Sequence, residues 1–455
     1  MSQHKTVPQA KGDFLLGNFR QVKGNSLNAF CDWQREYGDL VGFKIGARQF
    51  YLFSHPKLIE EALIKQSDVF VKMYDPRKPR GLELVLGEGL VTSKGELWQK
   101  QRCLMQPVFQ RKNLSALLPQ FAMVGEDMLK RWRQLGNGAE VNLANEMLRL
   151  TLEVITQTMF GTSVLDKVDR IAPALDTVLR FAARNMISPI SIPLTIPTSS
   201  NIKFKQAMGF LDEIIYTIIE QRRNKPSGNG DLLDMLLEAR DPHSKEPMSA
   251  KQIRDEVITI FSAGHETTSN LLTWTIYLLA KHPSVISTLR QEIEDTCNGK
   301  RLEFDDLPKL NYTKAVLNES LRIRSPVGMM IRKVSQNTEV DGYAIKAGSL
   351  AVFNIYNVHH HPDLWHEPER FDPARFLSNE SRRFSFMPFG AGERICIGNH
   401  FAMLESHLLL VMIIQTYDFE LLNPGEAEME MFVSIRPKGG LPARIWERFA
   451  NEANK

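Results

Sequence analysis

The chain has 455 residues, of which 43% are hydrophobic and 24% charged, a composition typical of a folded globular protein and not of a disordered one. With 56 basic and 53 acidic residues the net charge is +3, so no basic excess indicates nucleic acid as the main partner. The four cysteines form no close pairs, which excludes a dense disulfide framework or a zinc site and favours a reducing, cytoplasmic compartment.

The first half of the chain is predicted to be mostly helical. Its N-terminal segment has no long apolar run, so we expect neither a secretory signal nor a membrane anchor. Two short strands are expected over 40–55, on either side of a turn at Gly46. The apolar segment 186–199 contains three prolines and is expected to be a loop. Helices are expected over 56–66, 96–135, 139–160, about 166–184 and 201–223.

The second half contains the longest periodic segment, from about 250 to 281, with apolar residues at helical spacing. Ser249 and Gln252 have the spacing of a capping box at its start. Further helices are expected over 283–297, 312–324 and 397 to about 416, short strands over 330–355 and 417–446, and an ordered loop over 357–395. The fold class is therefore mainly α, helix-dominated with a small β-rich part, and we expect a single domain over residues 1–455.

Cys396 stands where the last long helix is expected to begin, within the sequence FGAGERICIGNHFAM of residues 389–403. A helix N-terminus favours negative charge, so a thiolate is stabilised there. Gly390, Gly392 and Gly398 allow tight turns and a close approach of the backbone to a flat group. A thiolate in an apolar environment is a good ligand for a soft metal ion, but a simply buried cysteine at a glycine-rich turn fits the same residues.

The pattern Phe389-x-x-Gly392-x-Arg394-x-Cys396-x-Gly398 resembles the haem-binding signature of cytochrome P450, the family of haem-thiolate monooxygenases. The resemblance implies the cytochrome P450 fold over essentially the whole chain. It also implies haem b as the cofactor, with the Cys396 thiolate as axial ligand of the iron. In some fatty-acid hydroxylases of the family a glutamate in the central helix binds haem covalently. Ala263 stands at that place here, so we expect non-covalent haem.

A second match lies in the middle of the helix expected over 250–281, where residues 263–268 are AGHETT. This stretch resembles the oxygen-activation motif of the family. The small Ala263 and Gly264 are expected to leave room for dioxygen and substrate beside the helix. Thr267 is expected to hold a proton donor beside the oxygen, and Glu266 to relay protons from solvent. Taken alone, these residues fit an ordinary solvated helix surface better, since most polar residues of helices are simply solvated.

Four further residues match the groups that bind the haem propionates in the family. Trp98 and Arg102 are one helical turn apart, and Arg332 and Arg394 lie far along the chain. Arginine suits this role because its guanidinium group binds carboxylates with two parallel hydrogen bonds. With Phe389 and Cys396 they form the expected cofactor-binding set.

A structural ion network is also implied by the resemblance. Glu319 and Arg322 are three residues apart, so they share one face of the helix expected over 312–324. Arg370, in the sequence PERF, is expected to complete the network from the following loop.

The substrate is expected to be apolar, such as a fatty acid, a terpenoid or a similar lipid, because the positions that line the pocket in the family are mostly apolar here. The segment 186–199 is a candidate roof over the pocket entrance or a surface that touches a membrane. The expected pocket residues are Met73, Tyr74, Leu84, Leu86, Phe261, Ala263, Val327, Met329, Met330, Phe432 and Val433.

The resemblance implies insertion of one oxygen atom of O2 into a C–H bond, with electrons from a separate ferredoxin or flavodoxin and its reductase. No dinucleotide-binding fingerprint is present, so the chain resembles the soluble bacterial type without membrane anchor or fused reductase. Lys100, Arg111 and Lys112 are a candidate basic patch for an acidic partner, although a solvated charged face fits them as well. The alternatives are a haem-thiolate peroxygenase or isomerase that uses no external electrons, and a non-enzymatic haem-binding protein.

Overall fold

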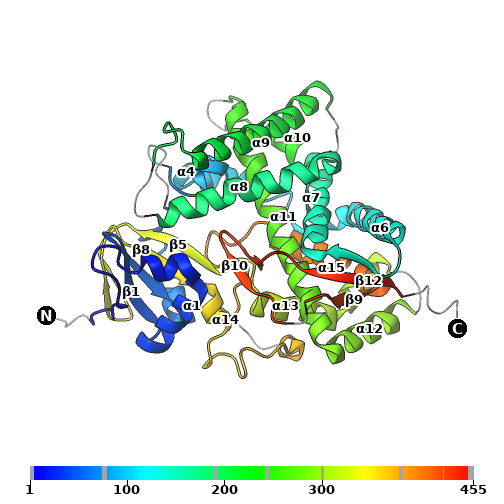
Figure 1. The fold of residues 1–455 in the computed structure, drawn as a ribbon. Coiled ribbons are helices and arrows are strands. Elements are labelled where there is room, and N and C mark those ends of the chain that lie inside the picture. Colours follow the sequence, from blue (N-terminus) through cyan, green and yellow to red (C-terminus); the bar gives the residue numbers. More distant parts are fainter. Residues whose placement is uncertain are drawn as a thin grey trace.

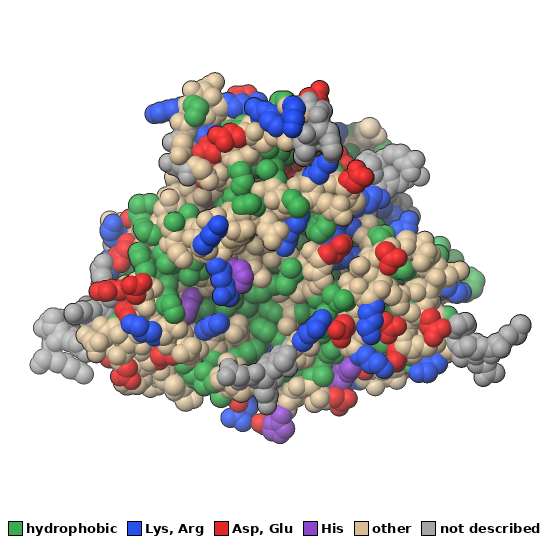
Figure 2. Space-filling view, turned by 180° about the vertical axis from the view of Figure 1, so that it is seen from behind, with side chains coloured by type: hydrophobic (Ala, Val, Ile, Leu, Met, Phe, Trp, Pro, Cys, Tyr) green, Lys and Arg blue, Asp and Glu red, His purple; other side chains and the backbone are tan. Residues whose placement is uncertain are grey.

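The computed structural model describes residues 5–73, 79–188, 192–226, 228, 230–240, 245–298, 302–378, 383–423 and 425–448. Helices fill the upper and right-hand parts of the molecule, and the largest sheet lies at the left (Figure 1). Acidic and basic side chains are interspersed over the opposite face (Figure 2), as the small net charge suggests. Within the described residues, no helix is both long and apolar enough to cross a lipid bilayer.

The long helix α11 (Ala250–Lys281) runs through the middle of the molecule (Figure 1). The predicted capping box is confirmed, because Gln252 N donates to Ser249 Oγ and Ser249 N donates to Gln252 Oε1. Helix α7 (Leu143–Phe160) packs along it, and Thr151 Oγ1 donates to the backbone oxygen of His265 at 2.9 Å. Most of α11 is buried, which identifies it as the core helix.

The remaining helices surround α11. The α-helices are α1 (Phe19–Tyr37), α2 (Pro56–Glu60), α3 (Glu83–Leu86), α4 (Gly95–Met105), α5 (Arg111–Leu114), α6 (Leu118–Leu135), α8 (Val168–Ile187), α9 (Ser199–Asn224), α10 (Leu232–Glu238), α12 (Pro283–Cys297), α13 (Asn311–Ile323), α14 (Ile355–His359) and α15 (Asn399–Thr416). Short 3-10 or π segments are Glu61–Lys65, Ser115–Leu117, Leu165–Lys167, Phe304–Lys309 and Pro373–Phe376.

The strands form one five-stranded sheet and three smaller ones. The large sheet has the order β1 (Leu40–Ile45), β2 (Arg48–Phe53), β8 (Leu350–Asn354), β5 (Met329–Val334) and β3 (Phe70–Val71), and only β2 and β8 are parallel. The smaller sheets are β4 (Ala139–Asn142) with β12 (Pro442–Glu447) and β9 (Tyr417–Leu421), β6 (Thr338–Val340) with β7 (Tyr343–Ile345), and β10 (Met429–Met431) with β11 (Ile435–Pro437).

The predicted fold class is confirmed, but two helix predictions are wrong in part. The segment 96–135 is not one helix, because α4 ends before Pro107 and α6 begins with Pro119 in its first turn. Residues 139–142 form strand β4 and not the start of a helix, and the Asn142 side chain caps α7 by accepting from Ala144 N. Helix α1 was not predicted, and its pattern is interrupted by the non-helical Asn25.

An ion network lies on α13, and one predicted member is wrong. The carboxylate of Glu319 and the guanidinium of Arg322 make two hydrogen bonds of 2.8 Å, and both side chains are fully buried. Of Arg370, only the backbone oxygen contacts Arg322. The Arg370 side chain pairs instead with the exposed Glu367. Arg375 takes the expected place, with Nε 3.3 Å from Glu319 Oε1.

We expect Glu319→Gln to lower the free energy of unfolding by about 3–5 kcal/mol, because it leaves two buried guanidinium groups without their carboxylate. Urea denaturation followed by circular dichroism measures this change. Glu428→Gln is the control, since Glu428 pairs with Lys438 at the exposed surface and its loss should change little. Equal destabilisation by both variants would contradict the structural role of Glu319.

Candidate active site

The loop before α15 presents Cys396 in a conformation that depends on glycine. Cys396 N donates to the backbone oxygen of Phe389 at 2.9 Å, which closes the loop. Gly390 and Gly392 have φ of +76° and +77°, in the left-handed region that other residues rarely adopt. A Cβ atom on Gly392 would also lie 3.0 Å from the backbone oxygen of Leu63. The glycines therefore determine where the cysteine points.

The Cys396 thiol is accessible beside a cavity of about 310 Å³. Although the residue is exposed, the protein atoms around its sulfur displace water and raise the pKa of the thiol, while a backbone hydrogen bond from Gly398 and the charge of Arg102 lower it. A metal ion bound to the sulfur would deprotonate it, as it does any coordinating thiol. The cavity is lined by Arg102, Gln106, Phe109, Gln110, Arg111, Ile395, Cys396, Ile397, Asn399 and His400.

Helix α11 is mostly buried, but near its middle one face is accessible. Ala263 is exposed and Thr267 half-buried, one turn apart, whereas Ser262 and His265 are buried. Thr267 Oγ1 donates to the backbone oxygen of Ala263 at 2.8 Å. Gly264 does not leave the expected room for a ligand, because a Cβ there would lie 2.8 Å from Ile155 of α7. The small residue at 264 thus serves helix packing, and Ala263 and Thr267 form the open face.

Three cations lie close together near the cysteine loop. Burial and the charges of Arg332 and Arg394 lower the pKa of Lys72 to about 7. Burial and the charge of Arg332 lower the pKa of Arg394 to about 10. The Glu393 carboxylate, 3.9 Å from Arg394 Nε, acts in the opposite direction and raises this pKa. Among the described residues, no carboxylate forms a hydrogen bond with Lys72 or Arg332. The cluster fits a ligand that carries carboxylates, as haem does with its propionates.

Trp98 and Arg102 lie beside this cluster on α4. The Arg394 guanidinium stacks over the Trp98 ring at 4.3 Å, a cation–π contact. Arg102 Nη1 donates to the backbone oxygen of Ile395 at 3.0 Å, next to Cys396. The structure therefore brings α4, the cysteine loop and Arg332 of β5 together, as the sequence predicted.

The expected pocket residues are divided among several environments. Leu86 and Phe261 are buried and Leu84 and Val433 partly buried in the main core, while Met73, Met329, Val327 and Met330 pack on the cores around the large sheet. Phe432 lies against the Arg180 guanidinium at 4.1 Å. Tyr74 lies outside the described residues. Their role in binding substrate stays a prediction.

Lys72 and Ser434 were missed by the sequence analysis. Val71 of β3 pairs with Lys333 of β5, and continuing this register places Lys72 opposite Arg332. Ser434 Oγ donates to Glu266 Oε1 at 2.6 Å across 168 residues of sequence. Neither residue belongs to a local motif, so only the pairing of distant segments could have revealed them.

Comparison with known proteins identifies what this arrangement resembles. A model of the cytochrome P450 family matches residues 8–441. Cyclooctat-9-en-7-ol 5-monooxygenase of Streptomyces melanosporofaciens is 32% identical over 83% of this chain and 82% of its own. Pentalenene oxygenase of Streptomyces avermitilis is 31% identical over 92% of both chains. The crystal structure of the cytochrome P450DA heme domain superposes with a TM-score of 0.87 at 27% identity, over 98% of both chains.

We expect Arg332→Gln to release haem at least about tenfold faster than the parent, because a buried cation facing a carboxylate contributes about 1.5–3 kcal/mol. Transfer of haem to an excess of apomyoglobin measures the rate. Arg35→Gln is the control, since Arg35 pairs with Asp32 on the exposed side of α1. An unchanged release rate in Arg332→Gln would show that this guanidinium does not bind haem.

Proposed function

The chain belongs to the cytochrome P450 family, and we propose that it is a monooxygenase that inserts one oxygen atom of O2 into a C–H bond of a terpenoid. The observation that carries this proposal is the position of Cys396. Cys396 is exposed on a glycine-dependent loop, near a cluster of cations in which Lys72 and Arg332 have no carboxylate hydrogen-bond partner among the described residues. A thiolate ligand and paired carboxylates are what a haem-thiolate protein has to accommodate.

Haem bound through a thiolate supplies the activation of dioxygen and the oxidation of the substrate. The residues of this chain hold and orient it. Cys396 provides the sulfur ligand, and the Phe389 carbonyl fixes the Cys396 backbone. Lys72, Arg332 and Arg394 neutralise the propionates, with Trp98 stacked on Arg394.

Glu266 and Thr267 of α11 are proposed to supply and hold the protons that the reaction needs. Burial raises the pKa of Glu266, which favours the carboxylic acid, the form that can donate a proton. The Thr267 hydroxyl lies on the open face of α11, next in sequence to Glu266. It is therefore proposed to receive the proton from Glu266 and to hold it beside the oxygen.

The substrate class rests on the relatives and on the expected pocket residues. Two relatives at 31% and 32% identity are named for oxidation of pentalenene and of cyclooctat-9-en-7-ol, which are terpenoid compounds. The expected pocket residues of this chain are apolar apart from the Tyr74 hydroxyl. An apolar lining selects by shape and burial of surface, which suits a compact hydrocarbon skeleton.

Electrons are proposed to come from a separate ferredoxin or flavodoxin with its reductase. Arg111 lines the cavity beside Cys396, and Lys112 follows it on α5. A positively charged surface there would steer an acidic partner toward the sulfur side of the haem.

We expect Cys396→Ser to abolish the red-shifted Soret band in the carbon monoxide difference spectrum of the reduced protein, because an alcohol cannot replace the thiolate. The parent should show the band. Cys103→Ser is the matched control, since Cys103 is an exposed cysteine on neighbouring α4 and its loss should leave the spectrum unchanged. A band that survives in Cys396→Ser would refute the proposed function.

We expect Thr267→Ala to lower hydroxylation per electron consumed at least about tenfold and to raise hydrogen peroxide release, because the proton is no longer held at the oxygen. Product, peroxide and oxygen consumption are measured together. Thr273→Ala is the control on the same helix, where Thr273 Oγ1 makes the same kind of bond to the backbone oxygen of Ser269. Unchanged coupling in Thr267→Ala would exclude this role.

A further inference from the structure

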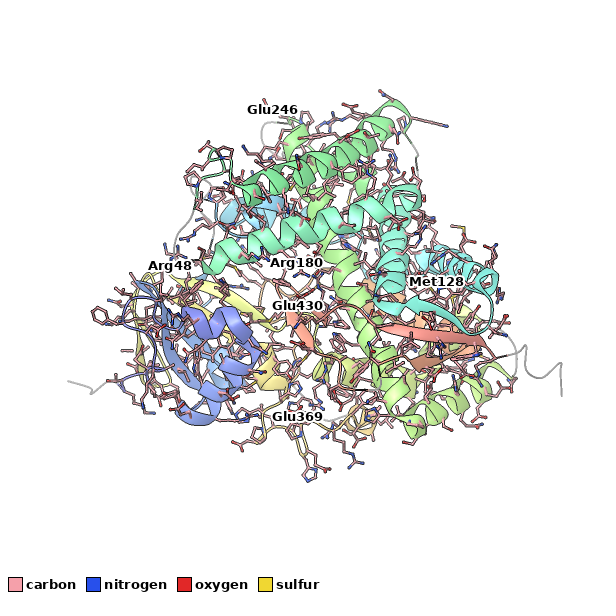
Figure 3. The ribbon with its side chains drawn as sticks, viewed as in Figure 1. Arg48, Met128, Arg180, Glu246, Glu369 and Glu430 are labelled. Carbon is pink, nitrogen blue, oxygen red and sulfur yellow. The ribbon has the colours of Figure 1, made fainter. Side chains whose placement is uncertain are left out.

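Four charged residues of α8, β10 and β11 form a closed ring of ion pairs. Figure 3 labels two of them, Arg180 and Glu430. Arg180 of α8 binds the Asp176 carboxylate at 2.7 Å and the Glu430 carboxylate at 2.9 Å. Arg436 of β11 binds the same two carboxylates. The ring therefore contains two cations and two anions, and its charge is balanced within itself.

Glu266 lies beside the ring, and among the described residues no cation forms an ion pair with its carboxyl group. Among the described residues, the hydrogen bond from Ser434 is the only one that the Glu266 carboxyl group receives from another side chain. The charges of Arg436 and Arg180 lower the pKa of Glu266, that of Asp176 raises it, and burial, the largest cause, raises it. Neighbouring His265 adds no charge, because burial lowers its pKa to about 4.

The Ser434 hydroxyl is itself held in place by α11. Asn270 Nδ2 donates to Ser434 Oγ at 3.0 Å, one turn beyond Glu266 on the same helix. Because an amide N–H can only donate, it uses a lone pair of the Ser434 oxygen. The single hydroxyl proton of Ser434 is then directed to Glu266 Oε1.

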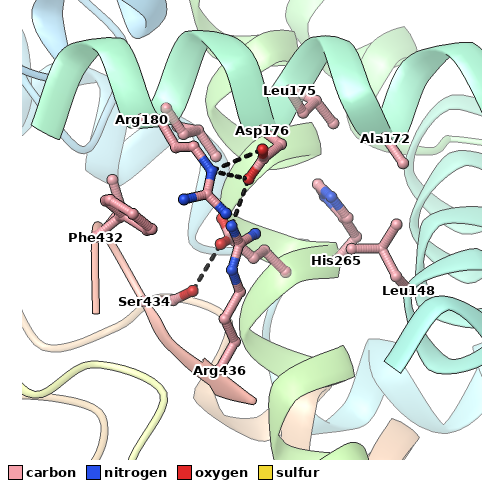
Figure 4. A pocket seen from close by; sticks show the side chains of 12 residues that line it. Leu148, Ala172, Leu175, Asp176, Arg180, His265, Phe432, Ser434 and Arg436 are labelled. Carbon is pink, nitrogen blue, oxygen red and sulfur yellow. Dashed lines mark hydrogen bonds and ion pairs between the residues drawn. The ribbon is translucent and has the colours of Figure 1, made fainter. Parts of the chain in front are cut away.

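A small cavity joins Glu266 to the ring (Figure 4). Its volume is about 30 Å³, which is the space of about one water molecule. Asp176, Arg436 and Ser434 line one side with polar groups, and Leu148 and Leu175 are among its apolar lining. The side chain of Asp176 is 36% exposed, so the ring connects the cavity with solvent.

We propose that Glu266 takes up its protons through this cavity from the Asp176 side of the ring, and that Ser434 is the residue that positions its carboxyl group there. This inference rests on the proposed function, in which Glu266 supplies protons toward Thr267.

One O–H bond of Glu266 breaks for each proton passed inward. A water molecule in the cavity restores it, and that water regains its proton from solvent by way of Asp176. The carboxyl group ends as it began, and one proton has moved inward.

The first test is an infrared titration of the Glu266 carboxyl band in the resting haem protein, which involves no turnover. Glu266→Gln identifies the band by its loss. We expect Ser434→Ala to move the titration to higher pH, because the carboxylate loses its hydrogen-bond donor. We expect Asp176→Asn to move it to lower pH, because a neighbouring negative charge is lost while both arginines remain.

Two further variants distinguish a positioning role of the Ser434 hydroxyl from a general disturbance of the local structure. Ser434→Thr keeps the hydroxyl and should restore the parent titration. Ser269→Ala removes a hydroxyl that donates to the Glu266 backbone oxygen and not to its carboxyl group, so it should cause no shift. Shifts of Ser434→Ala and Asp176→Asn in the same direction, or no shift in either, would overturn the inference.

The second test is the pH dependence of product formed per electron during turnover. We expect the pH profile of Ser434→Ala to move to higher pH and that of Asp176→Asn to lower pH, as in their infrared titrations. At the pH values where a variant forms less product per electron than the parent, it should release several-fold more peroxide. Infrared shifts with unchanged profiles would overturn the uptake route. A Glu266→Gln variant that keeps the parent profile would instead refute the relay in the proposed function, whereas Cys396→Ser tests the haem ligand independently of both.

Discussion

The close contact between α7 and α11 is the constraint on which the rest of the site depends. Ile155 occupies the space that a side chain at Gly264 would need, and Thr151 binds the backbone oxygen of His265. These contacts fix the rotation of α11 about its axis. One face is closed against α7, so Ala263 and Thr267 open on another face and Glu266 turns toward Ser434. A larger residue at 264 would displace all three.

Two groups of partly buried charges are balanced in opposite ways. Arg332 lowers the pKa of Lys72 and of Arg394, and no carboxylate among the described residues forms a hydrogen bond with Lys72 or Arg332, so this cluster suits an anionic ligand. The ring at Asp176 needs none, since its charges cancel. The first arrangement suits a cofactor that carries carboxylates. Beside the second, burial remains the largest cause of the raised pKa of Glu266.

The parts that the sequence analysis predicted correctly are the local ones. The strands at 40–55, the capped central helix and the loop at Cys396 depend on residues a few positions apart. What it missed depends on the meeting of distant segments. Arg375, in the turn Pro373–Phe376, lies beside Glu319 in place of Arg370, whose side chain pairs with Glu367. Lys72 meets Arg332 only through the pairing of β3 with β5. Strand register of this kind has no local signal.

Near the open face of α11, most polar side chains bond within the helix, whereas the Glu266 carboxyl group couples it to another segment. Thr267 and Thr268 bind the backbone oxygens of Ala263 and Gly264, and His265 binds that of Phe261, each four residues back along the helix. The hydrogen bonds of Thr267 and His265 thus close within α11, whereas Thr268 also makes a hydrogen bond to the Glu405 carboxyl group of α15. The carboxyl group of Glu266 reaches out to the loop between β10 and β11, which also carries Phe432 and Val433 of the expected pocket. A bound substrate that moves this loop would move Ser434 with it, so the supply of protons and the occupation of the pocket are linked through one hydroxyl group.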